Sequence, residues 1–277
     1  MTNKIPIIVL SYNRIEYLYL TISTLLSFID RDRYSILIWD DCSTDKRIQE
    51  WFSGNNVSFS YDYKPLTNFL ENIGRRNESY VLNKDYQLPH IDKGLIEFHS
   101  NRENFFKGFP GNYMKNGAAA INFANEKYND PEFIHIIEND VIVCKETFEI
   151  SEKISLEERN VGCVQTGRGV MTRLFKSNRK MYSDIEISDS DGSGSQQMCL
   201  NRKSLLAMKN VLNKQSYAYG FDWTIHHWLY NNGFRVVNFT NKSLYFHIGI
   251  NTSFNNNKFT DNMTFNPDFE RIKIVGL

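Results

Sequence analysis

The chain has 277 residues, which fits one large α/β domain or two closely packed halves. Lys and Arg together number 32, as do Asp and Glu, so the formal net charge is zero. This balance excludes an overall basic nucleic-acid-binding surface and gives no polybasic signal for anionic membranes. The hydrophobic content of 41% excludes a disordered chain.

The absence of targeting signals and the cysteine pattern predict a cytoplasmic protein. No run approaches about 18 apolar residues, so we expect no transmembrane helix. The short apolar run near the N-terminus is interrupted by Tyr12-Asn13-Arg14, too early for a signal peptide. The four cysteines show no paired spacing, which is against a zinc knuckle or a disulfide framework and favours a reducing compartment.

The first 45 residues read as a strand, a helix and a second strand. Residues 5–10 form a continuous β-branched run typical of a strand buried in a parallel sheet. Asn13 is the expected N-cap of a helix that continues to about Phe28, with apolar residues at helical spacing. A second buried run covers residues 35–39. The unit is βαβ, for which a right-handed connection is expected.

The middle of the chain is less regular. Alternation over residues 57–63 predicts a third strand, whereas residues 64–111 give no clear element. Residues 112–126 have helical periodicity, and residues 133–137 form another buried strand.

The second half has a different texture. Residues 181–197 are polar, and the Asp-Ser-Asp-Gly-Ser-Gly segment at 189–194 predicts a mobile loop. The remaining patterns predict strands at 161–165, 235–239 and 244–247, helices at 202–212 and 222–230, and a flexible tail from residue 251. No internal repeat or linker separates two independent domains.

Polar clusters follow three of the predicted strands. They are Ser11-Tyr12-Asn13-Arg14, Asp40-Asp41 and Glu138-Asn139-Asp140. Ligands of open α/β sheets bind at the carboxyl ends of the strands, so these groups are expected to converge on one edge. Each cluster alone could instead be a turn or a helix cap.

The usual phosphate-binding motifs are missing. The sequence has no Walker A segment, no Gly-rich dinucleotide fingerprint and no Gly-x-Ser-x-Gly elbow of a hydrolase. A nucleotide diphosphate would therefore need a metal bridge. Aspartate oxygens suit Mg²⁺ or Mn²⁺, and an imidazole can join them for Mn²⁺.

The opening of the chain resembles the GT-A nucleotide-sugar glycosyltransferases, especially family 2. The residues that carry the likeness are Ile5-Pro-Ile-Ile-Val-Leu-Ser-Tyr-Asn-Arg14 and Ile36-Leu-Ile-Trp-Asp-Asp-Cys-Ser-Thr-Asp45. Cys42 stands where the family commonly has Gly. The Asn116-Gly-Ala-Ala-Ala-Ile segment resembles the family's Asn-x-Gly helix.

Later segments follow the family in the expected order. Phe133–Val143 resembles the strand with the Asp-x-Asp motif, although Glu138 is its first acid, as in the N-acetylglucosaminyltransferase I family. Gly220-Phe-Asp-Trp223 resembles the Gly-Glu-Asp-Trp segment, with Phe221 in place of Glu. Phe246-His-Ile-Gly249 resembles the late His segment of several GT-A families. Residues 64–111 and 177–195 have no counterpart.

The resemblance implies a role for each matched residue. Tyr12 and the backbone of Leu10 and Ser11 would line a uracil pocket, and Asp41 would accept a hydrogen bond from uracil N3. Glu138 would contact the ribose or the donor sugar. The residues implied for the metal are Asp140 and His247, and the remaining residues implied for the nucleotide sugar are Asn13, Arg14, Asn116 and Asn139.

Asp222 would be the general base that takes a proton from the acceptor hydroxyl, in a one-step reaction that inverts the anomeric carbon. It could instead only cap its helix. His247 could be a structural histidine, as we expect for His135. His226 and His227 lie on unlike helix faces, so at most one should reach the site. Three aromatic residues form either an acceptor-stacking face or core packing: Trp223, Trp228 and Tyr230.

The sequence thus predicts a single GT-A domain with a mixed, mainly parallel sheet flanked by helices. Residues 1–143 would bind the nucleotide sugar, and residues 144–277 would bind the acceptor and end in the flexible tail. The predicted activity is metal-dependent, inverting transfer of a hexose or N-acetylhexosamine from a UDP-sugar to a glycan or glycolipid, with Mn²⁺ or Mg²⁺. The acceptor would be met in the cytoplasm, by analogy at the cytosolic face of a membrane. The alternatives are an inactive sugar-binding scaffold and a nucleotidyltransferase.

Overall fold

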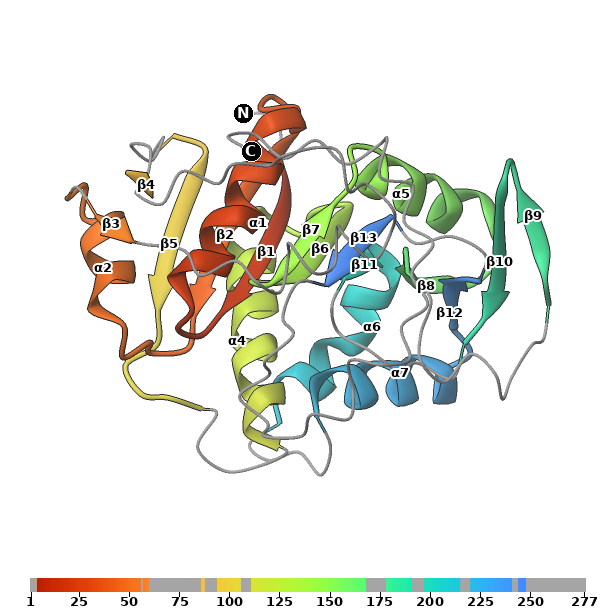
Figure 1. The fold of residues 1–277 in the computed structure, drawn as a ribbon. Coiled ribbons are helices and arrows are strands. Elements are labelled where there is room, and N and C mark those ends of the chain that lie inside the picture. The colour runs from red at the N-terminus through yellow and green to blue at the C-terminus, as the bar shows by residue number, and fades with distance from the viewer. Residues whose placement is uncertain are drawn as a thin grey trace, which may run out of the picture.

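The computed structural model describes residues 4–55, 57–59, 86–87, 94–105, 111–167, 178–190, 197–214, 220–240 and 244–247. Two layers of helices enclose a mixed sheet (Figure 1). The helices are α1 (Ile15–Phe28), α2 (Lys46–Phe52), α4 (Gly111–Lys127), α5 (Thr147–Glu157), α6 (Arg202–Leu212) and α7 (Phe221–Asn231). The strands are β1 (Ile5–Ser11), β2 (Tyr34–Asp40), β3 (Ser58–Phe59), β4 (Tyr86–Gln87), β5 (Ile96–Ser100), β6 (Phe133–Glu138), β7 (Val141–Val143), β8 (Val161–Gln165), β9 (Lys180–Tyr182), β10 (Ile185–Asp189), β11 (Gln197–Asn201), β12 (Arg235–Phe239) and β13 (Tyr245–His247).

Among the described residues, nine strands form the main sheet in the order β5-β2-β1-β6-β11-β8-β12-β10-β9. Parallel pairing runs from β5 through β2 and β1 to β6, and β12 is parallel to β8. Antiparallel pairs are confined to contacts of β11, β10 and β9. The predicted mixed, mainly parallel sheet flanked by helices is confirmed.

Strand β1 shows why the sheet is buried on both faces. Ile7 and Val9 pack into the core beneath α1, whereas Ile8 and Leu10 pack into a second core beneath α4. Both pairs are apolar because alternate side chains of a strand point to opposite faces, and here helices cover each face. The continuous β-branched run thus correctly predicted a central parallel strand.

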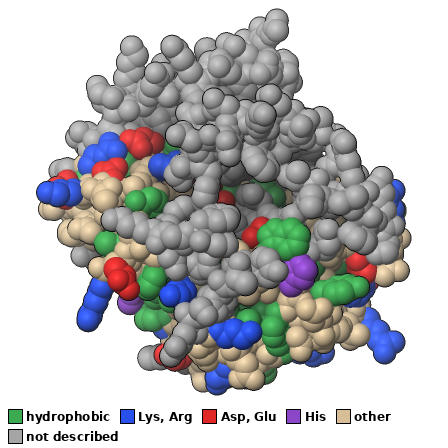
Figure 2. All heavy atoms as spheres, turned by 90° about the horizontal axis from the view of Figure 1, so that it is seen from below, with side chains coloured by type: hydrophobic (Ala, Val, Ile, Leu, Met, Phe, Trp, Pro, Cys, Tyr) green, Lys and Arg blue, Asp and Glu red, His purple; other side chains and the backbone are tan. Residues whose placement is uncertain are grey.

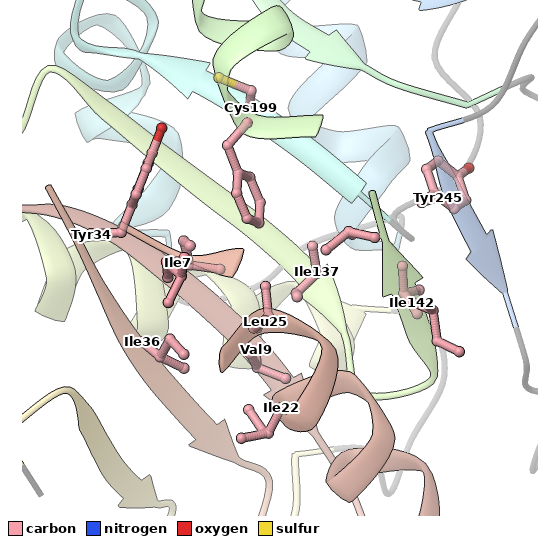
Figure 3. Close-up of a cluster of buried hydrophobic side chains, with 14 of the residues drawn as sticks. Ile7, Val9, Ile22, Leu25, Tyr34, Ile36, Ile137, Ile142, Cys199 and Tyr245 are labelled. Carbon is pink, nitrogen blue, oxygen red and sulfur yellow. The ribbon is translucent and has the colours of Figure 1, made fainter. Parts of the chain in front are cut away.

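The two cores divide the helices. One core joins α1, α2 and α5 to one face of the sheet, and Figure 3 shows its Ile22 and Leu25 lying over Ile7, Val9 and Ile36. The other core joins α4, α6 and α7 to the opposite face. The two sets of helices lie on opposite sides of the sheet in Figure 1.

Several element boundaries differ from the sequence predictions. Residues 181–197 are not one loop, since β9, β10 and the first residue of β11 lie there; residues 191–196 fall outside the described part. Of the predicted third strand at 57–63, the structure describes residues 57–59, where β3 pairs with β4 outside the main sheet. The structure adds β5, an edge strand within the segment that gave no clear element. The predicted tail from residue 251 lies outside the described residues.

A buried polar network ties α5 to the sheet. Glu152 accepts hydrogen bonds from His135 Nε2 at 2.8 Å and from the Tyr34 hydroxyl at 2.9 Å, and it pairs with Arg33. Burial by itself would raise the pKa of the Glu152 carboxyl, but the bond from His135 and the nearby positive charges outweigh it and lower that pKa. The prediction that His135 is structural is confirmed, because its side chain is fully buried in this network.

No helix of the described residues is long and apolar enough to cross a membrane.

Candidate active site

The ends of β1, β2 and β6 meet at one edge of the sheet, as predicted. In the strand register Ser11 lies opposite Asp40, and Leu10 lies opposite Glu138. Pairing continues past the strands, since the Asp41 amide donates to the Ser11 carbonyl at 2.8 Å and the Asn139 amide donates to the Leu10 carbonyl at 2.9 Å. The three polar clusters therefore meet at this edge.

Asn13 joins the loop after β1 to the loop after β2. Its side-chain oxygen accepts hydrogen bonds from the amides of Thr44 at 2.8 Å and Asp45 at 3.0 Å, and its own amide donates to the Ser43 hydroxyl. The prediction that Asn13 caps the following helix is wrong. Arg14 occupies that position without a side-chain cap, because the Asn13 side chain is used across the loops instead.

Three non-glycine residues of these loops have a left-handed backbone. Asn13, Arg14 and Cys42 have φ values of 53°, 60° and 56°. Asparagine tolerates this left-handed conformation, whereas other side chains pay roughly 1–2 kcal/mol for it. The value at Cys42 gives a physical reason for the Gly that the resembling family has at this position.

The two aspartates that end β2 have different roles. Asp40 is fully buried and accepts hydrogen bonds from the Ser43 amide and the Ser100 hydroxyl, each at 2.9 Å, so it shapes the loop. Asp41 is also buried, and its Oδ1 accepts from Asn101 Nδ2 at 2.9 Å and from the Phe105 amide at 3.0 Å. These bonds fix the position of the Asp41 carboxylate at the edge of the sheet.

Asn101 is a site residue that the sequence reasoning missed. Its side-chain amide nitrogen donates to Asp41 and, at 2.8 Å, to the Asn116 side-chain oxygen on α4. It therefore joins two residues predicted to bind the nucleotide sugar. The available signal was the apolar alternation of Ile96 and Phe98 in β5, which directly precedes Asn101.

Asp140 is paired with Arg14. The Arg14 Nη1 donates to Asp140 Oδ2 at 2.9 Å, and the Asp140 side chain is 6% exposed. The neighbouring Asn139 donates through its side chain to the Asn13 carbonyl at 3.1 Å and accepts from Thr21 at its own carbonyl. The Arg14 Nη2 and the Ser11 hydroxyl are buried without a hydrogen-bond partner in the described part of the chain.

The predicted metal residues are adjacent in the fold. Strand β13 pairs with β7 so that His247 lies opposite Val141, the residue after Asp140. The described side chains contain no group of three His, Cys, Asp or Glu residues that could hold a metal. A carboxylate and an imidazole are ligand types that suit Mn²⁺, and Arg14 would compete with the ion for one Asp140 oxygen.

Glu138 and Tyr12 are half-buried at the same edge, next to these groups. The Tyr245 ring on β13 covers Gly167, where an added Cβ would lie 2.1 Å from the ring. Burial, helped by the negative charge of Glu138, raises the pKa of the Tyr245 hydroxyl, which therefore stays neutral.

Helix α7 brings Asp222 toward this edge. The N-cap of α7 is Gly220, so the alternative in which Asp222 is the capping residue is wrong. Phe221 is fully buried, and its ring sits on Gly117 so tightly that an added Cβ there would lie 2.2 Å from Phe221 Cε2. Gly117 follows Asn116, so this contact links α7 to the donor-side residues. Phe221 thus has a packing role where the resembling family has Glu.

The aromatic residues of α7 separate into two groups. Trp228 packs against the core, whereas Trp223 is 38% exposed and stacks on His227 with ring centroids 5.0 Å apart. His226 is buried, with Nε2 3.9 Å from the Cys163 sulfur. The prediction that the two histidines occupy unlike faces is confirmed.

A cavity of about 300 Å³ lies elsewhere, between α4 and α6. Its lining includes Asn129, Pro131 and Arg202, which lie next to the beginning of β6 and the end of β11. It is therefore at the opposite edge of the sheet from the polar clusters.

Known structures share this fold. The structure is similar to solved nucleotide-sugar glycosyltransferases of the GT-A type, each at low sequence identity. No protein-family model matches the sequence, and no curated protein sequence is similar to it. The predicted GT-A fold is confirmed, whereas the likeness to N-acetylglucosaminyltransferase I stays a prediction.

Three of the similar structures are TarS residues 1–349 from S. aureus, the mannosyltransferase PcManGT from Pyrobaculum calidifontis with GDP-Man and Mn²⁺, and GalNAc-T7 with UDP, GalNAc and Mn²⁺. Their identities are 14%, 13% and 10%, and each TM-score is 0.50. The matches cover 89%, 86% and 85% of this chain, but only 61%, 55% and 42% of the others. The chain thus spans less than two thirds of the length of these proteins.

Proposed function

We propose that this protein is a metal-dependent, inverting glycosyltransferase. It transfers a hexose or N-acetylhexosamine from a UDP-sugar to a hydroxyl of a glycan or glycolipid. Residues 1–143 hold the donor, and residues 144–277 hold the acceptor. The similar structures include TarS with UDP-GlcNAc and GalNAc-T7 with UDP and Mn²⁺, which supports this donor class and a divalent cation.

One observation carries the proposal. The shared edge of β1, β2 and β6 holds two buried donor groups, Ser11 Oγ and Arg14 Nη2, that have no hydrogen-bond partner in the described chain. Burying such groups unpaired costs about 1–3 kcal/mol each, so they favour a ligand that supplies acceptors. Phosphate oxygens are suitable acceptors for a guanidinium.

The donor would lie across this edge. Tyr12, Leu10 and Ser11 line the uracil pocket, and Asp41 accepts a hydrogen bond from uracil N3. The bonds from Asn101 and Phe105 to Asp41 Oδ1 hold this carboxylate in place. Glu138 contacts the ribose or donor sugar, and Asn13, Asn116 and Asn139 hold the surrounding loops.

Asp140 and His247 are the proposed protein ligands of Mn²⁺ or Mg²⁺. When bound, the ion offsets negative charge on the departing diphosphate. Arg14 also offsets part of the negative charge of the diphosphate, because its guanidinium is positive and lies against Asp140. Asp222, in the first turn of α7, takes the proton of the acceptor hydroxyl as that oxygen attacks the anomeric carbon.

The test is a thermal-shift titration of the whole chain with UDP, GDP and CMP, each with Mn²⁺ and with EDTA. A nucleotide at about 100 times its Kd adds roughly 2.7 kcal/mol of stability, which is a shift of several degrees. We expect a shift with UDP and Mn²⁺ that EDTA abolishes and that Asp41→Asn reduces. The matched control is Asp32→Asn, an exposed carboxylate outside the site, which should keep the full shift.

A preference for GDP or CMP would overturn the role of Asp41. No shift with any nucleotide would instead favour the second candidate, an inactive sugar-binding scaffold. The Arg14–Asp140 pair favours that candidate, because it already neutralises the proposed metal ligand. Release of UDP from a panel of UDP-sugars then separates the two, since a scaffold binds without turnover.

A further inference from the structure

One face of α7 carries exposed rings at helical spacing. Trp223, His227 and Tyr230 are at positions i, i+4 and i+7, which lie on the same side of a helix, and all three are exposed. Tyr230 is 73% exposed. The opposite side of α7 is buried in the core through Phe221, Ile225 and Leu229. We call Trp223, His227 and Tyr230 the aromatic stripe.

Two rings at the N-terminal end of the aromatic stripe stack on each other. The Trp223 indole and the His227 imidazole are stacked, with centroids 5.0 Å apart and planes at 21°. This stacking restricts the indole, so less conformational entropy is lost when a ligand binds. In the view from below, hydrophobic (green), His (purple) and acidic (red) side chains meet on the face of the molecule where α7 lies (Figure 2).

The chemistry of the stripe fits a carbohydrate. An aromatic face carries partial negative charge and attracts the partly positive C–H bonds on the apolar face of a pyranose ring. The exposed side chains of α7 are these rings and the polar Asn231, with no exposed aliphatic group on the helix. Protein interfaces are also enriched in aromatic residues, but their cores are depleted of charged residues, whereas Asp222 directly precedes Trp223 here. Sugar hydroxyls instead need polar neighbours beside the rings.

The stripe is continuous with the candidate base, because Trp223 directly follows Asp222. Trp223 and Tyr230 are seven residues apart, about 10 Å along a helix, which is the length of roughly two linked pyranose rings. We propose that the stripe binds the acceptor as an oligosaccharide of at least two sugar units, whose terminal ring stacks on Trp223 and whose next unit lies toward Tyr230. This rests on the proposed function and deepens it by naming the acceptor class.

The test observes the indole N–H signals of ¹⁵N-labelled protein, of which the sequence supplies four. Trp223→Phe identifies the Trp223 signal. The probes are the methyl glycosides of glucose, galactose, mannose and N-acetylglucosamine, and the disaccharides cellobiose, lactose, mannobiose and diacetylchitobiose, each with UDP and Mn²⁺. We expect at least one disaccharide to move the Trp223 signal and to bind more tightly than its monosaccharide.

Variants then separate the two positions. Trp223→Ala should weaken binding of both the disaccharide and its monosaccharide, and Tyr230→Ala should weaken only the disaccharide, by roughly threefold to tenfold as expected for one aromatic contact. Leu206→Ala is the matched control, because Leu206 is 52% exposed on α6 outside the stripe, and it should change neither affinity.

The inference is overturned if protein that binds UDP shows no movement of the Trp223 signal with any probe. It is also overturned if Tyr230→Ala weakens both ligands equally or neither. Loss of the UDP response in the thermal shift counts against the proposed function instead. Sugar binding at the stripe without any UDP response would keep the carbohydrate surface and remove its role as the acceptor site of a transferase.

Discussion

The donor-side edge and the outer face of α7 are built in opposite ways. At the edge, Asn13, Asp40 and Asn101 make hydrogen bonds that join separate segments of the chain. On α7, the exposed rings depend on the helix itself and on one stacking contact. The edge is suited to a ligand of fixed shape, such as a nucleotide diphosphate. The helix face is suited to ligands that share only an apolar ring face.

The largest effect is expected at Asp222, which lies between the two regions and is the proposed general base. Asp222→Asn should lower kcat by about 10²–10⁴-fold, the usual contribution of a general base, because an amide cannot accept the proton. The UDP-induced thermal shift should be unchanged. Glu126→Gln, an exposed carboxylate at the far end of α4, is the control and should keep wild-type kcat. Full activity of Asp222→Asn would remove Asp222 as the base.

A substitution of Glu152 tests whether this buried carboxylate stabilises the fold without affecting donor binding. Glu152→Ala leaves His135 and Tyr34 without their acceptor and should cost about 3–5 kcal/mol of unfolding free energy, measured by urea denaturation. The donor affinity of the protein that remains folded should not change. A loss below 1 kcal/mol would show that the network contributes little.

The lowered pKa of Glu152 also predicts that the stability of the protein depends on pH. Because its native pKa lies below the unfolded value, its contribution to stability is present above the unfolded pKa and is lost as pH falls through the native pKa. In Glu152→Gln this loss below about pH 4.5 should be smaller than in the wild type. Equal acid slopes in the two proteins would contradict the assignment.

The contact between Gly117 and Phe221 links the two regions. Gly117→Ala places a methyl group against the Phe221 ring, which should cost about 1–3 kcal/mol of stability and lower kcat, because Asp222 moves with Phe221. Phe221→Leu in the same chain removes part of the clash and should restore part of both losses. If the double variant is worse than either single one, the contact is not the cause. Ala120→Gly on the same helix controls for helix propensity.

The smallest effect is expected at Cys42. Cys42→Gly relieves a left-handed backbone, but it also adds freedom to the unfolded chain, so the net gain should be about 0.5–1 kcal/mol. Asn129→Gly is the matched control at a φ of 54°, where Asn already tolerates this conformation, and its gain should be smaller. A melting temperature that falls for Cys42→Gly would contradict the strain at this loop.

The elements that were predicted well are those with a strong local pattern. Helix α6 and strands β8 and β12 have the predicted bounds, because apolar spacing alone fixes which side chains reach the core. The errors fall where polar residues are held by distant partners. In β10, Ile185 and Ile187 are buried in the core on the face of the sheet that α1 and α5 cover, although the sequence around them is polar.

The sequence alone predicts that polar groups gather at the carboxyl ends of buried parallel strands. Which of these groups stabilise the fold depends on the tertiary structure. Asp40 closes its own loop, Asp41 is fixed by Asn101 from 60 residues away, and Asp140 is paired with Arg14 from 126 residues away. Local patterns record hydrophobicity and backbone preference, whereas a hydrogen bond between distant segments depends on where the folded chain places both partners.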